Sequence, residues 1–189
     1  MTKQIKIITG ILGVLIIIYI FNVRSQNTYQ INTTEIFNGN IDDIAFINIE
    51  DGDKDLQLVR SDTTWKIANA DSLIIKENQI DNLFNKVLKV QKEVLMTSKP
   101  EKWEKFGVTD SIGKHLKLFK EDGDLILHYL FGNKGQDYQH NYIRSINSDD
   151  VYRTDNNVFY LLNTNENYWG QVPPKAKPND SLNLQLKEK

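Results

Sequence analysis

The chain lacks cysteine altogether and has only four prolines and three histidines among its 189 residues. Without cysteine it can form no disulfide and has no thiol nucleophile, and it cannot carry the lipid that bacterial lipoproteins attach to a cysteine. The absence is compatible with either redox compartment. The folded part must therefore be stabilised by packing alone.

A surplus of basic residues is also missing. The net charge is −2, from 23 lysines and arginines against 25 aspartates and glutamates, and the two signs are interspersed along the chain. Nucleic-acid binding needs a basic face or stripe. We therefore expect no nucleic-acid partner.

Recognisable catalytic motifs are lacking as well. No serine lies in a G-x-S-x-G turn, and the glycine-bounded segment 132–135 does not have the spacing of a phosphate-binding loop. This segment joins two expected strands, so we interpret it as a turn.

The three histidines, His115, His128 and His140, do not form a recognisable metal-binding motif. The expected hairpin places His115 and His128 on one face, opposite Leu130 and Lys117 respectively, with no acidic residue directly alongside. We therefore predict no catalytic, cofactor or metal site, and we expect that the protein is not an enzyme.

One long apolar run is present, Ile5–Val23, and it carries no charge beyond Lys6. Its uncharged part has about 17 residues, which is about 25 Å as a helix against a hydrocarbon core of about 30 Å. Lys6 can extend the usable span by reaching to the lipid headgroups. The run predicts a transmembrane helix, and we assign residues 1–23 to a signal anchor in the bilayer.

Basic residues flank this run unequally. Lys3, Lys6 and the free amino group precede it, and Arg24 follows it. This bias predicts that the N-terminus stays inside and that the C-terminal part is extracytoplasmic, as a single-pass protein of the cytoplasmic (inner) membrane. The alternative is a cleaved secretory signal, which would leave a secreted or periplasmic protein.

Composition divides the remainder into three segments. Residues 24–42 are rich in asparagine, threonine and glutamine and predict a polar juxtamembrane spacer. Residues 43–170 carry the regular apolar patterns of a single domain, and residues 171–189 form a polar C-terminal tail. About 160 residues beyond the anchor suffice for one domain with its own core.

Period-two alternation begins at Asp43 and predicts a meander of three antiparallel strands, with turns at Gly52-Asp53 and Ser61-Asp62. Such a register places all the apolar side chains on one face. The pairs expected across the two turns are Ile49 with Leu56, Ile47 with Leu58, Leu58 with Trp65, and Leu56 with Ile67.

From Glu77 the apolar spacing changes to a helical period, which predicts an amphipathic helix lying over the meander. Acidic residues early and lysines late in this segment also suit the helix dipole. The apolar face consists of Ile80, Leu83, Phe84, Val87 and Leu88, and Val94 and Leu95 continue it less regularly.

The second half predicts further strands and a closing helix. Asp122-Gly123 is expected at the tip of a hairpin, followed by a strand from Tyr138 to Ile146 and a helix from Val158 to Tyr168. The predicted fold class is α+β, with an antiparallel β-meander and hairpins packed against an amphipathic helix, plus one N-terminal transmembrane helix. The pairs expected in the hairpin are Leu116 with Tyr129, Leu118 with Leu127, and Lys120 with Leu125.

Several short phrases occur in the order seen in a known family: Trp65-Lys66-Ile67, Lys105-Phe106-Gly107-Val108, Leu130-Phe131-Gly132, Tyr142-Ile143-Arg144 and Val151-Tyr152. On these phrases, residues 43–168 resemble domain-of-unknown-function family 4340 (DUF4340). The resemblance implies a single copy of that domain behind a membrane anchor, and a role beside ABC-type transport or gliding-motility components of the cell envelope. It implies no catalytic residue.

A candidate interaction surface lies on the strand expected from Tyr138 to Ile146. Alternation places Tyr138, His140, Tyr142 and Arg144 on one face, and Tyr152 could extend it. Aromatic residues with an arginine are typical of protein interfaces. The alternative is that the tyrosines pack under the last helix and Arg144 is an ordinary exposed cation.

These observations predict a non-enzymatic, membrane-anchored extracytoplasmic protein. We expect it to serve as an interaction or accessory subunit of a bacterial cell-envelope complex, with a membrane or envelope protein as its partner. The resemblance links that complex to ABC-type transport or gliding motility. The alternative is an exported small-molecule or glycan-binding module that uses the Tyr/His/Arg strand face.

Overall fold

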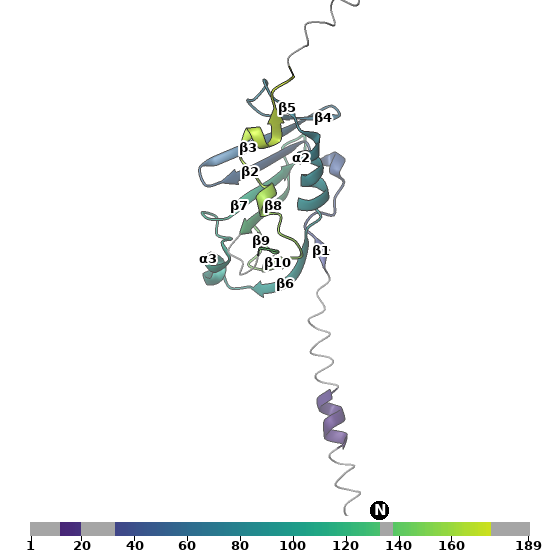
Figure 1. Cartoon of the computed structure of the whole chain (residues 1–189). Helices are drawn as coiled ribbons and strands as arrows, with labels where there is room; N and C mark the ends of the chain where they lie inside the picture. Colours follow the sequence, from purple (N-terminus) through teal and green to yellow (C-terminus); the bar gives the residue numbers. More distant parts are fainter. Residues whose placement is uncertain (1–11, 20–32, 133–137, 175–189) are drawn as a thin grey trace, which may run out of the picture. The chain divides into compact units, whose positions relative to one another are not determined.

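The computed structural model describes residues 12–19, 33–132 and 138–174, and the chain divides into two units, Met1–Thr34 and Glu35–Lys189 (Figure 1). In the first unit, residues 12–19 form a helix. None of the helices in the described ranges combines the length and the apolar character needed to cross a membrane. Apart from residues 12–19, the predicted anchor Ile5–Val23 lies outside the described residues, as do residues 175–189 of the predicted tail.

The second unit is built on a nine-stranded sheet. The strand order is β1-β6-β10-β9-β8-β7-β2-β3-β4, and the pairs from β6 to β4 are all antiparallel (Figure 1). The strands are β1 (Thr34–Glu35), β2 (Phe46–Asp51), β3 (Lys54–Ser61), β4 (Thr64–Ile67), β6 (Gln91–Thr97), β7 (Lys114–Phe119), β8 (Leu125–Gly132), β9 (Tyr142–Ser145) and β10 (Val151–Thr154).

Short elements connect these strands. A large antiparallel sheet with few short helices is an α+β fold, so the predicted fold class of the domain is confirmed. The connecting elements are η1 (Ile41–Asp43), β5 (Ile74–Ile75), which pairs with β11 (Gly170–Gln171), α2 (Glu77–Asn82), the π-helical η2 (Leu83–Val87), η3 (Pro100–Lys102), α3 (Trp103–Phe106), η4 (Phe159–Leu161) and α4 (Glu166–Trp169).

The main core lies between the sheet and the continuous segment formed by α2 and η2. Leu83 and Val87 are fully buried, and the ring of Phe84 lies 5.7 Å from the ring of Trp65 on β4. The prediction that an amphipathic helix covers the meander is therefore confirmed. Its last five residues form a single widened π-helical turn, in which Leu88 N donates to the Leu83 carbonyl five residues earlier.

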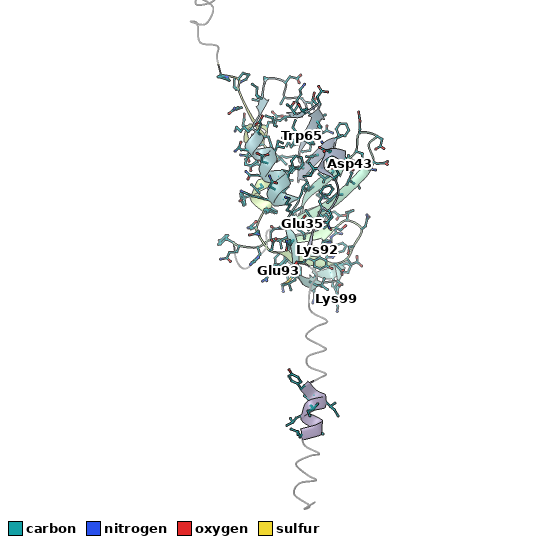
Figure 2. All side chains as sticks on the ribbon, turned by 90° about the vertical axis from the view of Figure 1, so that its right-hand side faces the viewer. Glu35, Asp43, Trp65, Lys92, Glu93 and Lys99 are labelled. Atoms are coloured by element: carbon teal, nitrogen blue, oxygen red, sulfur yellow. The ribbon has the colours of Figure 1, made fainter. Side chains whose placement is uncertain are left out.

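The continuation of this helix through Val94 and Leu95 is wrong, because both residues lie in β6. There Val94 pairs with Arg153 and Leu95 with Tyr152 of β10. Gln91–Thr97 thus completes the sheet beside β10, and tertiary pairing outweighs the weak helical periodicity of this segment. Figure 2 shows Glu35 of β1 close to Lys92 and Glu93 of β6, on the outer side of that strand.

The first turn of the meander is confirmed and the second is shifted. Asp51 pairs with Lys54, as a turn at Gly52-Asp53 requires. In the second turn Ser61 pairs with Thr64, so the tip is Asp62-Thr63, and Asp62 adopts the left-handed φ of 55°. Leu58 therefore pairs with Ile67 rather than Trp65.

A shift of two residues leaves every side chain on its predicted face, because the side-chain period of a strand is two. The prediction of a single apolar face for the meander is thus confirmed despite the altered pairing. All six of its predicted members are buried: Ile47, Ile49, Leu56, Leu58, Trp65 and Ile67.

The second hairpin follows the prediction until one bulge. Leu116 pairs with Tyr129 and Leu118 with Leu127. The expected pair of Lys120 with Leu125 is wrong, because a bulge brings Phe119 opposite Leu125. The tip at Asp122-Gly123 is confirmed, with Gly123 at a φ of 89°.

The folded unit begins before the predicted boundary at residue 43. Ile36 and Phe37 are buried in the main core, and Ile36 N donates to the carbonyl of Val90. Residues 35–42 therefore belong to the folded unit, because these two apolar side chains complete its core beside η2.

The predicted helix from Val158 to Tyr168 is also wrong. The chain forms η4, then a break, then α4. In the break Asn163 Oδ1 accepts a bond from Asn165 N, and Asn165 Oδ1 caps α4 by accepting from Asn167 N. Asparagine side chains that bond the nearby backbone compete with helix continuation. Leu162 of this segment is nevertheless fully buried in the main core.

Candidate functional site

The predicted Tyr/His/Arg strand face does not exist as one surface. Strand β9 begins only at Tyr142. Tyr138 lies before it in an irregular segment, and Tyr138 is 97% exposed. Tyr142 and Arg144 are buried, with Arg144 only 2% exposed. The prediction that these residues share an accessible face is therefore wrong.

Asn141 explains why the strand starts late. It is fully buried, and its backbone N donates to Thr154 Oγ1, while its Oδ1 accepts from Val158 N at 2.9 Å. These bonds hold the chain before β9 against the segment that follows β10. Residues before Tyr142 are thus directed away from the ladder and cannot alternate as a strand.

Arg144 fastens the segment around α3 to the outer face of the sheet. Its Nε donates to the Val108 carbonyl at 3.0 Å, and one terminal nitrogen lies 2.6 Å from Asp110 Oδ1. The guanidinium carbon also lies 3.7 Å from the ring centroid of Trp103. Beside it is a small apolar cluster of Phe106, Val108, Leu130, Tyr142 and Val151.

Tyr152 lies on the other face of the sheet. It pairs with Ile143 and packs against the main core, so it does not extend the predicted surface. Its hydroxyl donates to Asp150 Oδ2 at 3.3 Å. Burial, and then the neighbouring Asp150 charge, raise the pKa of Tyr152 above its ordinary value.

A cleft of about 780 Å³ lies between the end of η2 and the segments on either side of the β9–β10 pair. Two of the five predicted residues, Tyr138 and His140, line this Tyr138 cleft. Tyr160 also lines it and is 62% exposed. The remaining side chains that line it are mostly amides and cations, including Asn85, Lys86, Lys89, Asn156 and Asn157.

Hydrogen bonds fix one wall of the cleft. His140 Nδ1 lies 2.8 Å from the Thr154 carbonyl oxygen, which can only accept, so we assign a proton to Nδ1. Asn157 Nδ2 donates to the Tyr138 carbonyl. The backbone that presents the Tyr138 ring is therefore tied to the segment after β10.

The charges at the cleft are unbalanced. Lys86 and Lys89 make no ion pair within the described residues. Asp155 is engaged, since its Oδ1 accepts from Gln91 N and its Oδ2 from Asn156 Nδ2. Sequence reasoning missed the two lysines and Tyr160, because they come from separate segments that only the folded chain brings together.

The two strand histidines form a pair on the outer face. Their predicted partners are confirmed, with His115 opposite Leu130 and His128 opposite Lys117. His115 Nδ1 lies 2.9 Å from His128 Nε2, and His115 Nε2 lies 2.9 Å from the Asp110 carbonyl oxygen. Because that carbonyl accepts, we assign the His115 proton to Nε2, and His128 Nε2 then donates to His115 Nδ1.

The surroundings of this pair differ from the expectation in one respect. Glu50 of β2 pairs with His115, so an acidic residue does lie beside the histidine pair. The Glu50 carboxylate, however, forms an ion pair with Lys117 Nζ at 2.6 Å. Burial first, and then the charge of His115, lower the pKa of His128 to about 4. The described residues contain no group of three or more side chains that could hold a metal ion.

A family model described as a domain of unknown function, DUF4340, matches residues 27–171. The match begins before β1 and ends at β11, so it includes the early core residues Ile36 and Phe37. No curated protein and no solved structure matches the chain. Since the family model covers well over half of the sequence, the chain belongs to the DUF4340 family.

Proposed function

We propose that this protein is a non-enzymatic, membrane-anchored accessory protein of a bacterial cell-envelope complex, with its folded domain outside the cytoplasm. The observation that carries the proposal is the helix at residues 12–19. Its apolar side chains are all 50–69% exposed and point in every direction around the helix. A helix that is apolar on all sides requires lipid or protein around it, because water solvates such a surface poorly.

The flanking charges support the orientation. Lys3 and Lys6 precede the apolar run, which favours a cytoplasmic N-terminus and an exported domain. The surface of the domain supports binding rather than catalysis. Of the titratable groups around the Tyr138 cleft, His140 bonds a carbonyl and Asp155 holds the backbone. The family resemblance favours a complex of the ABC-type transport or gliding-motility class.

The topology can be tested with reporters fused after Lys189 of the full chain. We expect activity from a phosphatase that works only outside the cytoplasm, and none from a fluorescent protein that folds only inside. Ile16→Lys should release the protein from membranes, since a charge in mid-bilayer costs about 3 kcal/mol. Ile74→Lys is the matched control, because both residues are 50% exposed and Ile74 lies in the domain.

Two outcomes would contradict this proposal. Activity of the cytoplasmic reporter alone would reverse the topology. A mature protein that begins near Gln26 would show that the run is removed, which is the secreted or periplasmic alternative. The accessory role itself predicts co-purification of membrane proteins after cross-linking in intact cells and detergent extraction, and recovery of this chain alone would count against it.

A second candidate function is a ligand-binding module, and the Tyr138 cleft favours it. The cleft keeps Tyr138 and His140 of the predicted surface, although Tyr142, Arg144 and Tyr152 lie elsewhere. A ligand at 100 times its dissociation constant should stabilise the protein by about 2.7 kcal/mol. A thermal-shift screen on the full chain in detergent tests this candidate, and no shift with any sugar or small polar molecule would remove it.

A further inference from the structure

We propose that the Tyr138 cleft binds an oligosaccharide that carries carboxylates, of the uronic-acid class. This inference rests on the second candidate function above, and it names the ligand chemistry and the residues that recognise it. Three properties of the cleft lead to it: exposed aromatic rings, amides with free bonding capacity, and two lysines without acidic partners.

The aromatic rings come first. Tyr138 is 97% exposed and Tyr160 is 62% exposed, whereas Tyr129 and Tyr142 of the same domain are buried. A tyrosine offers an apolar ring face together with a polar hydroxyl. The C–H face of a pyranose is apolar and its edge carries hydroxyls, so a sugar ring matches this side chain in both respects. Two such rings at one cleft suit a chain of sugars.

The amides supply the polar contacts. Asn85 is exposed and its side chain makes no hydrogen bond within the described residues, and the Asn156 side chain uses only its Nδ2, which donates to Asp155. Each amide therefore keeps an acceptor, and Asn85 also keeps two donors. Sugar hydroxyls both donate and accept, so side-chain amides are suited to bind them.

The lysines indicate the charge of the ligand. Lys86 and Lys89 lie three residues apart, both line the cleft and both are exposed. Asp155, across the cleft, already accepts bonds from Gln91 N and Asn156 Nδ2. Both lysines thus line the cleft without an ion pair to an acidic side chain of the described residues. No arginine lines it, so the two lysines would hold an anion as point charges and not through a bidentate fork.

An acidic peptide fits this cleft less well. Extended peptides commonly bind by adding a strand to a free sheet edge. Here the neighbouring strands β9 and β10 are both interior, since each has a partner on either side. Recognition must therefore come from side chains, which suits a glycan.

The test is calorimetric titration of the full chain in detergent micelles. We expect tetragalacturonic acid to bind, and the neutral tetrasaccharide cellotetraose to bind at least about 10-fold more weakly, since each tenfold change is about 1.4 kcal/mol. Lys86→Gln with Lys89→Gln should remove most of that preference and its salt dependence. Tyr138→Ala and Tyr160→Ala should each weaken binding of both sugars about 10-fold.

The matched control is Lys54→Gln with Lys66→Gln, two exposed lysines on the β3–β4 hairpin, which should leave binding unchanged. Equal binding of the two sugars, binding of a tetraglutamate peptide without the sugar, or displacement by inorganic phosphate alone would each overturn the proposal, as would no binding at all. Membrane fractionation of the same variants does not depend on the cleft. If the sugars do not bind, the proposed accessory role is unaffected. If the reporters show a reversed topology, the binding result is unaffected.

Discussion

The hydrogen bond between His115 and His128 requires that one of the two facing ring nitrogens carries no proton. With both rings neutral, His128 Nε2 donates to His115 Nδ1 across 2.9 Å, and a single added proton can be accommodated by reversing that bond. When both rings are charged, the two facing nitrogens are both donors and the bond is lost. This agrees with the direction of the His128 pKa, which burial and the charge of His115 lower.

We expect His128 to lower the stability of the fold as the pH falls. The pKa of His128 is about 4 in the folded chain against 6.5 in the unfolded chain. The unfolded chain binds the proton first, so this contribution is complete above pH 6.5 and is lost as the pH falls towards 4. Because the His128 ring is partly exposed, we expect the loss in the free energy of unfolding to be about 1 kcal/mol.

Urea unfolding at pH 7 and at about pH 4 measures this effect. The wild type should lose about 1 kcal/mol more than His128→Gln between the two conditions. The comparison of the two proteins cancels the titration of carboxylates elsewhere. Equal losses in the two proteins would contradict the assignment to His128.

Arg144 is expected to be the most important charged residue for stability. Arg144→Ala removes bonds to Val108 and Asp110 and the contact with Trp103, and leaves a cavity in a site that is 2% exposed. We expect a loss of about 3 kcal/mol in the free energy of unfolding. Arg60→Ala removes a pair with Asp42 and two bonds to the carbonyls of Ile41 and Asp42 from a side chain that is 28% exposed, and it should cost less, about 1 kcal/mol. If urea unfolding gave similar losses of stability for the two variants, the special role of Arg144 would be refuted.

Neither interpretation of Arg144 from the sequence was right. It is neither part of an exposed interaction face nor an ordinary exposed cation, because it is buried under Trp103 and Asp110. Those partners lie more than 30 residues earlier in the chain. A pattern read along one strand contains no information about which distant segment will cover it.

At the scale of elements, β8 and α3 meet so closely that only glycine fits. A Cβ on Gly132 would overlap the Phe106 carbonyl oxygen and stand 2.8 Å from the carbonyl carbon and oxygen of Gly107. These are backbone atoms at the end of α3, where Gly107 itself has a left-handed φ of 70°. The end of the helix therefore cannot move aside without losing its terminal turn.

Gly132→Ala should consequently destabilise the protein by about 3 kcal/mol, at the upper end of typical overpacking costs. Gly52→Asn is the control, since Gly52 has open space around its Cα and asparagine tolerates its φ of 60°. The control should stay within about 0.5 kcal/mol of the wild type. Thermal unfolding followed by circular dichroism compares the two, and a Gly132→Ala variant as stable as the control would exclude the close contact.

Elements that depend on local pattern were predicted well. The buried face of the meander, the helix over it and the hairpin tip at Gly123 follow from period and turn chemistry. The bulge at Phe119 and the strand at Gln91–Thr97 could not be predicted, because each is decided by the strand that lies beside it. The same holds for the Tyr138 cleft, whose walls come from three separate parts of the sequence.

At the scale of the whole molecule, the sheet is covered unequally on its two faces. Its inner face carries the main core, which α2 and η2 cover together with Ile36 and Phe37. The described residues of its outer face include the small cluster under α3, and the polar row from Glu50 and Lys117 to the histidine pair. The stability of the domain therefore depends mostly on the inner face and on every segment that closes it.

The position of the N-terminal boundary tests this dependence. A fragment of residues 33–174 should fold, because it contains all of the buried core residues of the domain. A fragment of residues 43–174 lacks Ile36 and Phe37, whose loss should cost about 2–5 kcal/mol each, comparable with the whole stability of a small domain. We expect the longer fragment to unfold cooperatively and the shorter one to be largely unfolded or aggregated. Equal unfolding midpoints would restore residues 24–42 to the role of a spacer.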